Sequence, residues 1–269
     1  MPIIGIDEDK CTSCFECGRS CPALLFKKEG DTVSYQGKGR ICILCGHCIA
    51  VCPEDAILYK NMKDEPASFD GVEDPKTIIS YDDIYKFTRA KRSIRRFKST
   101  PVPQELLEKV FEVIRYAPSG SNMRKCKFHL VSDQETLKTL SSSILEAFMA
   151  NPNVRMMYGN LLVSVNKKGL PDPIFRGAPH VIFASSILPG PTPLNNAGIS
   201  LTYGMLAAQS LGLATCWIGF AQAGFFMNTD LLKLVGIKGK CTGAMAIGYP
   251  AVKYHRCPPR APLKVKGLK

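Results

Sequence analysis

The chain has 269 residues, 45% of them hydrophobic, and a formal net charge of +12 at pH 7. This length and apolar content allow one large or two ordinary domains and exclude a chain too polar to build a core. The basic excess lies entirely after residue 60. Charge alone does not choose among nucleic acid, acidic lipid, a phosphorylated cofactor and a solvated face as its explanation. The opening MPIIGIDEDK does not have the pattern of a secretory signal, so we expect a cytoplasmic protein.

Eight of the twelve cysteines lie in two runs with one spacing, C-x2-C-x2-C-x3-C-P. The first run ends at Cys21 and the second, 31 residues later, ends at Cys52. Such a repeat predicts a small unit with approximate two-fold symmetry. In a reducing compartment, cysteines clustered in this way favour metal ligation over disulfides.

This spacing predicts two 4Fe-4S clusters with interleaved ligands. The first three thiolates of a run can bind three corners of one cubane, while the fourth, beyond a turn, points toward the other cluster. The predicted ligand sets are Cys11, Cys14, Cys17 and Cys52 for one cluster, and Cys42, Cys45, Cys48 and Cys21 for the other. Zinc is the alternative, but it does not explain a third and fourth cysteine followed by proline in both runs.

The first 60 residues resemble bacterial two-cluster ferredoxins. They contain hardly any aliphatic core, so we expect this domain to depend on its clusters for folding. The next residues, 61–80, are polar, contain two prolines and have no helical or strand period, which is typical of a linker. The expected organisation is therefore a cluster domain at 1–60, a linker at 61–80 and a second domain at 81–269.

The second domain reads as mixed α and β. A helix begins near Ser80, and another follows Pro103 with an apolar stripe that Pro118 ends. Two more helical patterns, near 134–149 and 196–212, alternate with four short strands: KFHLVSD, APHVIFASS, ATCWIGF and GAMAIGYP. This pattern predicts a sheet that is buried on both faces.

One long stretch, Gly177 to Thr229, contains no Asp, Glu, Lys or Arg, which raises the question of a membrane span. The stretch is interrupted by PGPTP and NNAG, and its segment AGISLTYGMLAAQSLGLA mixes polar with apolar residues. That mixture suits a helix buried among protein neighbours, so we expect no membrane span.

The segment KRSIRRFK, residues 91–98, gathers five basic side chains that repel one another unless an anion is near. Arginine forks and a serine hydroxyl suit a phosphate. A nucleic-acid groove would use the same residues, but usually with exposed aromatic residues between them, whereas Phe97 resembles a core anchor. On charge alone, an anion site and a solvated face remain equally supported.

Four motifs occur in the order found in the FMN-dependent nitroreductase family, which residues 82–265 resemble. They are KRSIRRF (91–97), APSGSN (117–122), GLATCWIGF (212–220) and IGYPAV (247–252), followed by Arg260 in RAPL. The resemblance implies an α+β protein in which a small ferredoxin-like cluster-binding domain precedes a nitroreductase-like α/β sandwich with a central, mostly antiparallel sheet. It also implies a homodimer with FMN at the subunit interface, for which helix 196–212 would suit the seam.

The resemblance also implies the residues of the FMN site. The phosphate would be held by Lys91, Arg92, Ser93, Arg95 and Arg260. The isoalloxazine would be lined by Pro118, Ser119, Gly120 and Asn122. The flavin N5 would face the backbone of Trp217, Ile218 and Gly219.

Clusters followed by a flavin predict an iron-sulfur flavoprotein oxidoreductase that reduces an electron-poor organic acceptor, such as a nitroaromatic, a quinone or an activated alkene. No G-x-G-x-x-G or Walker motif is found, so we expect no dedicated nicotinamide-binding domain, and a ferredoxin-like protein is an expected electron donor. NAD(P)H is the alternative donor, because it can deliver hydride at an open face of the flavin, as in many relatives. No catalytic side chain is assigned. Within residues 145–175, a group of aromatic and methionine side chains would either cover the substrate or, more often, belong to the core: Phe148, Met149, Met156, Met157 and Tyr158.

Two other functions fit parts of the sequence. One is a noncatalytic redox relay or flavin-binding sensor that signals through the ferredoxin-like unit. The other is a zinc-containing nucleic-acid binder that uses the basic segment. Bound iron, sulfide and flavin would exclude the binder, and steady turnover of an acceptor would exclude the sensor.

Overall fold

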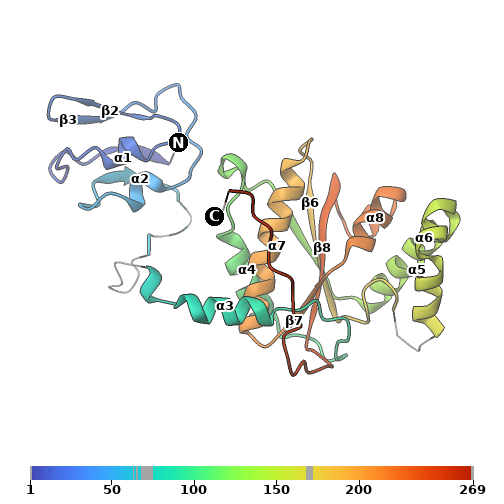
Figure 1. The fold of residues 1–269 in the computed structure, drawn as a ribbon. Helices are drawn as coiled ribbons and strands as arrows, with labels where there is room; N and C mark the ends of the chain where they lie inside the picture. Colours follow the sequence, from blue (N-terminus) through green and yellow to red (C-terminus); the bar gives the residue numbers. More distant parts are fainter. Residues whose placement is uncertain (1, 63, 65, 68–74, 168–171, 268–269) are drawn as a thin grey trace. The chain divides into compact units, whose positions relative to one another are not determined.

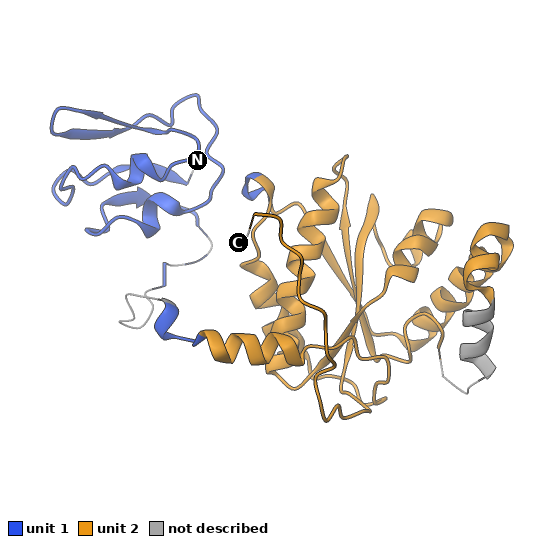
Figure 2. Cartoon of the chain, in the orientation of Figure 1, with its two compact units in different colours: residues 1–80, 121–123 blue, residues 81–120, 124–269 orange. Residues whose placement is uncertain are grey.

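The structure is a computed structural model that describes residues 2–62, 64, 66–67, 75–167 and 172–267, with only the backbone for residues 75 and 160–167. Contacts divide the chain into two compact units (Figure 2). Unit 1 comprises Met1–Ser80 and Ser121–Met123, and unit 2 comprises Tyr81–Gly120 and Arg124–Lys269. The linker expected at 61–80 lies partly outside the described residues, and the expected domain boundaries stay a prediction.

The described residues of unit 1 form two antiparallel strand pairs, two one-turn α-helices and the short 3-10 helix η1 (Pro75–Thr77). The outer strands β1 and β4 pair with each other, and β2 and β3 form a hairpin. The elements are β1 (Ile3–Ile6), α1 (Glu16–Arg19), β2 (Phe26–Glu29), β3 (Thr32–Tyr35), α2 (His47–Ala50) and β4 (Ile57–Tyr59). Its buried core is small, and it includes two of the cysteines: Ile3, Cys17, Leu25, Phe26, Val33, Cys48 and Ile57.

The backbone of unit 1 repeats with the cysteine pattern. Four pairs of residues with positive φ are each separated by 31 positions: Ser13 and Leu44 (56° and 58°), Phe15 and Gly46 (66° and 74°), Leu24 and Asp55 (51° and 47°), and Gly30 and Asn61 (59° and 58°). A left-handed conformation costs a non-glycine residue about 1 kcal/mol, so these positions are specified by their surroundings. Alternating left- and right-handed residues also point successive N–H groups in one direction, which makes an anion-binding backbone.

Unit 2 is centred on a four-stranded antiparallel sheet with the order β5-β6-β8-β7. The strands are β5 (Lys127–Val131), β6 (His180–Ser186), β7 (Ala214–Trp217) and β8 (Lys240–Gly248). All four strands expected from the sequence are present, and the mostly antiparallel sheet is confirmed.

Helices cover both faces of this sheet (Figure 1). The helices α4 (Gln104–Arg115) and α7 (Thr192–Ser210) lie on one face, and α5 (Gln134–Ala150) and α8 (Gly219–Met227) lie on the other. The remaining elements are α3 (Tyr81–Ala90), η2 (Gly120–Asn122), α6 (Pro152–Lys167) and α9 (Leu231–Leu234).

The central strands alternate between the two cores. In β6, Val181 and Phe183 pack into the core with α5 and α8, whereas Ile182 and Ala184 pack into the core with α4 and α7. This alternation follows from the period of two in a strand, and it explains why β6 has no exposed residue. The expectation of a sheet buried on both faces is confirmed.

Four helices, α3, α4, α5 and α7, match the expected segments, with small differences at their ends, whereas α6, α8 and α9 were not expected. The segment ATCWIGF was expected as a strand, but its strand ends at Trp217 and α8 begins at Gly219. Helix α7 begins at Thr192, four residues before the predicted start, because Pro193 is tolerated in a first turn whose N–H groups need no intrahelical partner. Among the described helices, none combines the length and apolarity needed to cross a membrane.

Candidate functional site

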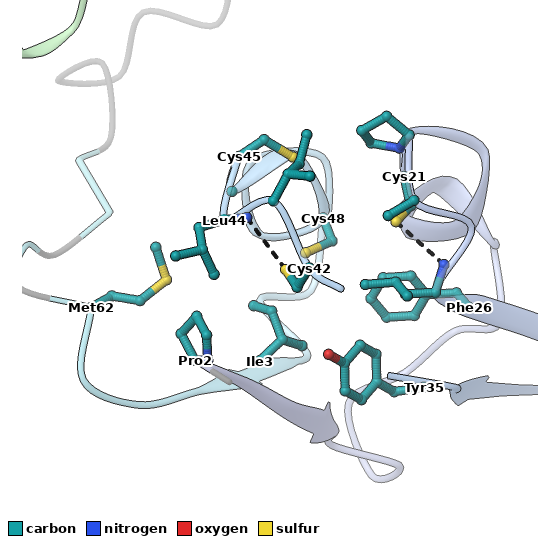
Figure 3. Close-up of a pocket in the computed structure, with 15 residues that line it drawn as sticks. Pro2, Ile3, Cys21, Phe26, Tyr35, Cys42, Leu44, Cys45, Cys48 and Met62 are labelled. Atoms are coloured by element: carbon teal, nitrogen blue, oxygen red, sulfur yellow. Dashed lines mark hydrogen bonds between the residues drawn. The ribbon is translucent and has the colours of Figure 1, made fainter. Parts of the chain in front are cut away.

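The thiols of each predicted cluster set line a single cavity in unit 1. Cavity A is lined by Cys11, Cys14, Cys17 and Cys52. Cavity B, shown in Figure 3, is lined by Cys21, Cys42, Cys45 and Cys48. The fourth cysteine of each run therefore lies with the first three of the other run, as the spacing predicts. Iron binding by these residues stays a prediction.

Backbone amides point at the sulfurs of both cavities. Leu25 N–H donates to Cys21 Sγ at 3.4 Å, and Ala56 N–H donates to Cys52 Sγ at 3.2 Å. These two bonds are equivalent in the repeat, and iron-sulfur proteins use such N–H···S bonds to stabilise cluster charge. All eight cysteines are free thiols. Among the described residues, no group of three or more His, Cys, Asp or Glu side chains is placed to hold a single metal ion. The sulfur donors that line each cavity are four thiols. This donor set fits a thiolate-held cluster.

Burial keeps the innermost thiols protonated in the absence of metal. It raises the pKa of Cys48 to about 11, and the nearby Cys45, Cys21 and Cys42 also raise it. Burial raises the pKa of Cys17 in the same way. Because a metal ligand must be a thiolate, cluster assembly has to release these protons.

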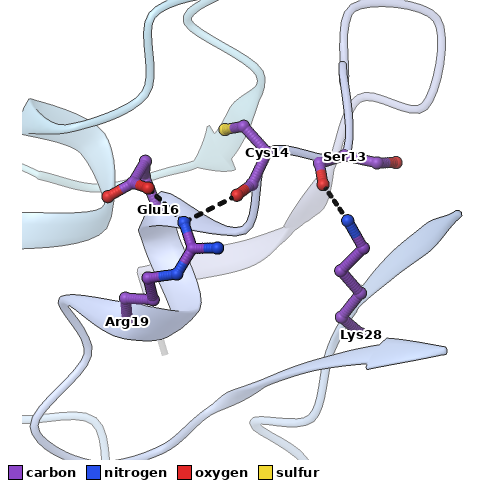
Figure 4. A network of polar contacts seen from close by, with 5 residues as sticks. All are labelled: Ser13, Cys14, Glu16, Arg19 and Lys28. Carbon is purple, nitrogen blue, oxygen red and sulfur yellow. Dashed lines mark hydrogen bonds and ion pairs between the residues drawn. The ribbon is translucent and has the colours of Figure 1, made fainter. Parts of the chain in front are cut away.

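Two basic side chains donate hydrogen bonds to the backbone of the first cysteine loop, residues 11–17 (Figure 4). Arg19 donates to the carbonyl oxygen of Cys14 at 3.0 Å and forms an ion pair with Glu16. Lys28, on β2, donates to the carbonyl oxygen of Ser13 at 2.6 Å. These bonds hold the strained turn between Cys11 and Cys17 in place.

Unit 2 contains a larger cavity, cavity C, with a volume of about 690 Å³. Four residues of the predicted FMN site line it: Arg95, Trp217, Ile218 and Gly219. Its other walls are mostly apolar and aromatic. They come from α5, α6, α8, β7 and the segment before β6: Phe148, Val154, Tyr158, Ile174, Arg176, Cys216, Phe220, Ala223 and Met227. Phe148 and Tyr158 therefore line the cavity, whereas Met156 and Met157 are exposed.

Cavity C is strongly cationic. Arg95 and Arg176 both line it, and no Asp or Glu among the described residues does. Burial, and then repulsion by Arg95, lowers the pKa of Arg176, and burial also lowers the pKa of Lys91. An anion in the cavity would relieve both effects.

Arg176 was not among the site residues predicted from the sequence, although its position in the sequence could have indicated it. It is the last charged residue before the stretch from Gly177 to Thr229 that contains no Asp, Glu, Lys or Arg. It also has a left-handed backbone with φ of 64°, an uncommon conformation for arginine.

The edge strand β7 positions the basic segment beside the cavity. Ile94 N–H donates to Thr215 O at 3.1 Å, and Ser93 bridges Thr215 in parallel orientation. Farther along, Lys98 N–H donates to Tyr249 O at 2.9 Å. The segment thus runs along the sheet edge, where Lys91, Ser93 and Arg95 lie near Cys216 at the cavity wall.

The turn from β7 into α8 presents a backbone donor. Ile218 N–H is already bonded to Ala244 O at 2.8 Å. Gly219 is the first residue of α8, so its N–H has no intrahelical acceptor. A Cβ at Gly219 would meet no atom within 4 Å, so this backbone is open on one side. Because Gly219 also lines cavity C, its N–H is a candidate donor to the flavin.

The remaining predicted residues do not line cavity C. Gly120 N–H donates to Asn196 Oδ1, on α7, at 3.1 Å, and Ser119 Oγ accepts from Arg124 N–H at 3.1 Å. Asn122 groups with unit 1. Pro118 and Arg260 are exposed, and Arg260 lies in a C-terminal segment without helix or strand. Arg92 is half-buried, and its carbonyl accepts from Lys91 Nζ at 2.8 Å.

Comparisons with known proteins match both units. Residues 10–57 match the 4Fe-4S dicluster domain, and residues 88–249 match the nitroreductase family. A ferredoxin of Methanothermococcus thermolithotrophicus is 42% identical over 59 residues, which are 21% of this chain and 97% of the ferredoxin. The NAD(P)H FMN reductase of Bacillus subtilis (strain 168) is 29% identical over 174 residues, which are 63% of this chain and 67% of the reductase.

A solved structure supports the fold of unit 2. The nitroreductase with bound FMN from Bacteroides fragilis NCTC 9343 superposes with a TM-score of 0.56 and 22% identity, covering 70% of this chain and 97% of that one. At this identity the similarity shows the fold alone. Together with the family match over residues 88–249, it shows that the chain belongs to the nitroreductase family and carries a 4Fe-4S dicluster domain at residues 10–57.

Proposed function

We propose that the protein is an iron-sulfur flavoprotein oxidoreductase. It binds 4Fe-4S clusters in cavities A and B and FMN in cavity C, and it reduces an electron-poor organic acceptor. The observation that carries this proposal is the presence, in one chain, of two four-thiol cavities and a cationic, aromatic-walled cavity at a helix N-terminus. When bound, the clusters supply one-electron transfer, and the flavin supplies the exchange between single electrons and hydride.

In unit 1 the chain's part is to hold the clusters in a partly buried, hydrogen-bonded site. Eight thiolates provide the ligands, and the N–H groups of Leu25, Leu44 and Ala56 each donate to a cysteine sulfur. The buried side chains of Ile3, Leu25 and Ile57 belong to the same small core as the two buried thiols, Cys17 and Cys48. The match of residues 10–57 to a dicluster domain supports this assignment.

In unit 2 the cationic residues bind the anionic part of FMN, and the backbone orients its ring. Lys91, Ser93 and Arg95 come from one segment and converge near Cys216, as phosphate binding requires. The Gly219 N–H donates to the flavin ring without adding an acid that would compete for its proton. The FMN bound in the Bacteroides fragilis nitroreductase supports the choice of cofactor.

The aromatic wall of cavity C suits a flat acceptor. Phe220 makes edge contacts with Phe148 and Tyr158, with ring centroids 5.7 and 5.4 Å apart. Such a wall excludes water and offers stacking surface to a nitroaromatic, a quinone or an activated alkene. The electron donor is a ferredoxin-like protein or NAD(P)H, and the match to an NAD(P)H FMN reductase supports the second.

We also propose that the active form is a homodimer. Pro118, Ser119 and Gly120 do not line cavity C of their own chain, yet the resemblance to nitroreductases assigns them to the isoalloxazine. A second copy of the chain can supply them. Analytical ultracentrifugation of the FMN-loaded protein tests this, and a monomer with full FMN affinity would contradict it.

The deciding experiment is anaerobic purification with quantification of iron, sulfide and FMN, followed by turnover assays. We expect eight iron and eight sulfide for two 4Fe-4S clusters, about one FMN per chain, and steady reduction of an acceptor with NAD(P)H or reduced ferredoxin. A protein that is reduced once and then stops would be a redox relay or sensor. A colourless protein that contains zinc would contradict the proposal.

A further inference from the structure

The first cysteine loop has an equivalent in the repeat, the second cysteine loop at residues 42–48, so the contacts that hold the two loops can be compared position by position. In the first loop, Lys28 Nζ donates to Ser13 O at 2.6 Å (Figure 4). Arg19 donates to Cys14 O at 3.0 Å. Ser13 adds its own hydroxyl, which donates to Asp31 O. The first loop is therefore held by three side chains from residues 13–28.

The second cysteine loop lacks these three donors. The equivalent positions, 31 residues later, are occupied by residues of another kind: Leu44 for Ser13, Ala50 for Arg19 and Tyr59 for Lys28. Leucine and alanine side chains cannot donate a hydrogen bond, and tyrosine carries no positive charge at neutral pH. The second loop nevertheless contains the same left-handed turn, with φ of 58° at Leu44 against 56° at Ser13. It therefore has to be held by other contacts.

Asn122 supplies such a contact. Its Nδ2 donates to Leu44 O at 2.7 Å and to Ile43 O at 3.0 Å. Leu44 O is the repeat equivalent of Ser13 O, the carbonyl oxygen that Lys28 binds in the first loop. Asn122 belongs to unit 1, although 78 positions separate it from Leu44 along the chain.

An asparagine suits this position for two reasons. Its amide nitrogen carries two N–H donors, so it can bind two successive carbonyl oxygens, whereas a carboxylate offers only acceptors. Asn122 also has a left-handed backbone, with φ of 50°, which asparagine tolerates better than most residues. Its side chain is half-buried, so water competes less for these bonds than at an exposed site.

The contact also orients an N–H group toward a sulfur. Because a peptide group is planar and trans, its C=O and its N–H point in opposite directions. Asn122 holds the carbonyl of Ile43, and the N–H of the same peptide group, that of Leu44, donates to Cys42 Sγ at 3.4 Å. Hydrogen bonds to cluster sulfurs favour the more negatively charged, reduced state and therefore raise the reduction potential. Asn122 thus acts on the sulfur through this peptide group.

We propose that Asn122 is a positioning residue for the 4Fe-4S cluster in cavity B, which holds the second cysteine loop so that Leu44 N–H points at Cys42 Sγ. This inference rests on the proposed function, which supplies the cluster. It also gives one short segment two tasks, because the resemblance to nitroreductases assigns the neighbouring residues 118–120 to the isoalloxazine.

The test is an anaerobic redox titration of the full-length holoprotein, followed by the EPR signals of the reduced clusters. Asn122→Gly removes both donors and keeps a residue that adopts positive φ without strain. We expect one of the two cluster transitions to move to a lower potential by about 59 mV, which corresponds to a tenfold change in the ratio of reduced to oxidised cluster. The other transition should not move, because Lys28 and Arg19 hold the first loop.

Two further variants complete the design. Lys28→Met removes the equivalent bond from the first loop, so it should lower the potential of the other transition. Asn61→Gly is the matched control. Asn61 is an exposed asparagine of unit 1 with φ of 58°, and it lines neither cavity A nor cavity B, so neither potential should move.

The inference is overturned if Asn122→Gly keeps eight iron and leaves both potentials unchanged. It is also overturned if Asn122→Gly and Lys28→Met lower the same transition. If Asn122→Gly does not assemble its clusters, Asn122→Asp decides in the same way, because it keeps the size of the side chain and has no N–H donor. Unmodified protein without iron would contradict the proposed function instead.

Discussion

The backbone N–H of Ile218 donates a hydrogen bond to the carbonyl oxygen of Ala244 at 2.8 Å. This bond continues the pairing of β7 with β8 beyond Trp217, the last residue of β7. The Ile218 N–H, one of the backbone donors that the resemblance assigned to the flavin, is therefore already used within the sheet. The next N–H along the chain, that of Gly219, begins α8 and lies at the wall of cavity C.

Gly219 provides a test that separates the backbone donor from the side-chain space. Gly219→Pro removes the N–H at a first helical position, where proline is tolerated, so we expect FMN to bind about tenfold more weakly through loss of one hydrogen bond. Gly219→Ala keeps the N–H, and its Cβ meets no atom within 4 Å, so affinity should stay within about twofold. Fluorescence titration of the flavin-free protein measures both. Equal affinities in the two variants would show that this N–H does not contact FMN.

Arg176 is expected to contribute to anion binding in cavity C. Arg176→Gln should weaken FMN binding about tenfold, because it removes a positive charge from the wall of the cavity. Lys109→Gln removes an equal charge from an exposed position on α4 and serves as the control. When the same titration is repeated at higher salt, the FMN affinity of Arg176→Gln should fall less than that of the unmodified protein, whereas the affinity of the Lys109→Gln control should fall as much. An unchanged affinity would place Arg176 outside the FMN site.

Two glycines of α7 should respond in opposite ways to alanine. At Gly204 an added Cβ would lie 2.7 Å from Ile114 Cδ1, where α4 and α7 approach closely, so Gly204→Ala should destabilise the protein by about 1–3 kcal/mol. At Gly198 the Cβ meets nothing within 4 Å, so Gly198→Ala should stabilise the helix by up to about 1 kcal/mol. Denaturant unfolding checks both. A stable Gly204→Ala variant would mean that Ile114 moves aside.

His180 should make unit 2 sensitive to acid. Its Nε2 accepts a hydrogen bond from Val102 N–H at 2.9 Å, and its Nδ1 lies 2.7 Å from Ser132 Oγ. Burial lowers its pKa below the ordinary 6.5. The unfolded chain therefore binds the proton first, so the free energy of unfolding should fall as the pH drops below about 6.5.

Replacing the imidazole tests this pH effect. His180→Gln keeps an acceptor for Val102 N–H. It should flatten the pH dependence of the free energy of unfolding between pH 7.5 and 5.5, as measured by unfolding followed with the fluorescence of the single tryptophan, Trp217. Burial also lowers the pKa of His129, so His129→Gln is measured in parallel. If the free energy of unfolding of the His180 variant depends on pH as steeply as that of the unmodified protein, His180 is not the group responsible for the acid sensitivity.

Iron removal should unfold unit 1 and leave unit 2 folded. The buried core of unit 1 is small and includes the ligands Cys17 and Cys48, whereas unit 2 has two extensive cores around its sheet. After anaerobic chelation, hydrogen exchange should become fast for the amides of β1 to β4 and stay slow for β6 and β8. Retained protection in β1 and β4 would show that unit 1 folds without metal.

Local patterns in the sequence predicted much of the fold. The seven residues of β6, HVIFASS, are uniformly buried because a strand covered on both faces has no solvent side. The apolar stripe after Pro103 became α4, which begins at Gln104 and buries Leu107, Val110 and Ile114. These features depend on spacing within a single element, so one chain suffices to predict them.

The candidate site was only partly predictable, because its residues come from distant parts of the chain. Arg176 reaches the same cavity as Arg95 only because β6 and β7 are both neighbours of β8. The Asn196 side chain that holds Gly120 N–H comes from α7. No periodicity within a segment encodes such contacts, and neither does the use of Ile218 N–H by Ala244.

The sequence by itself determined the pairing of cysteines in two sets of four, since a rigid C-x2-C-x2-C turn limits which thiols can meet. The sequence also determined that both faces of the sheet are covered, because apolar residues at both alternating positions of a strand must be buried on both sides. Only the tertiary structure decided which donors and charges serve each site, such as Asn122 at the second cysteine loop and Arg176 at cavity C. The physical reason is that hydrogen bonding and burial depend on neighbours that folding brings together, whatever their separation along the chain.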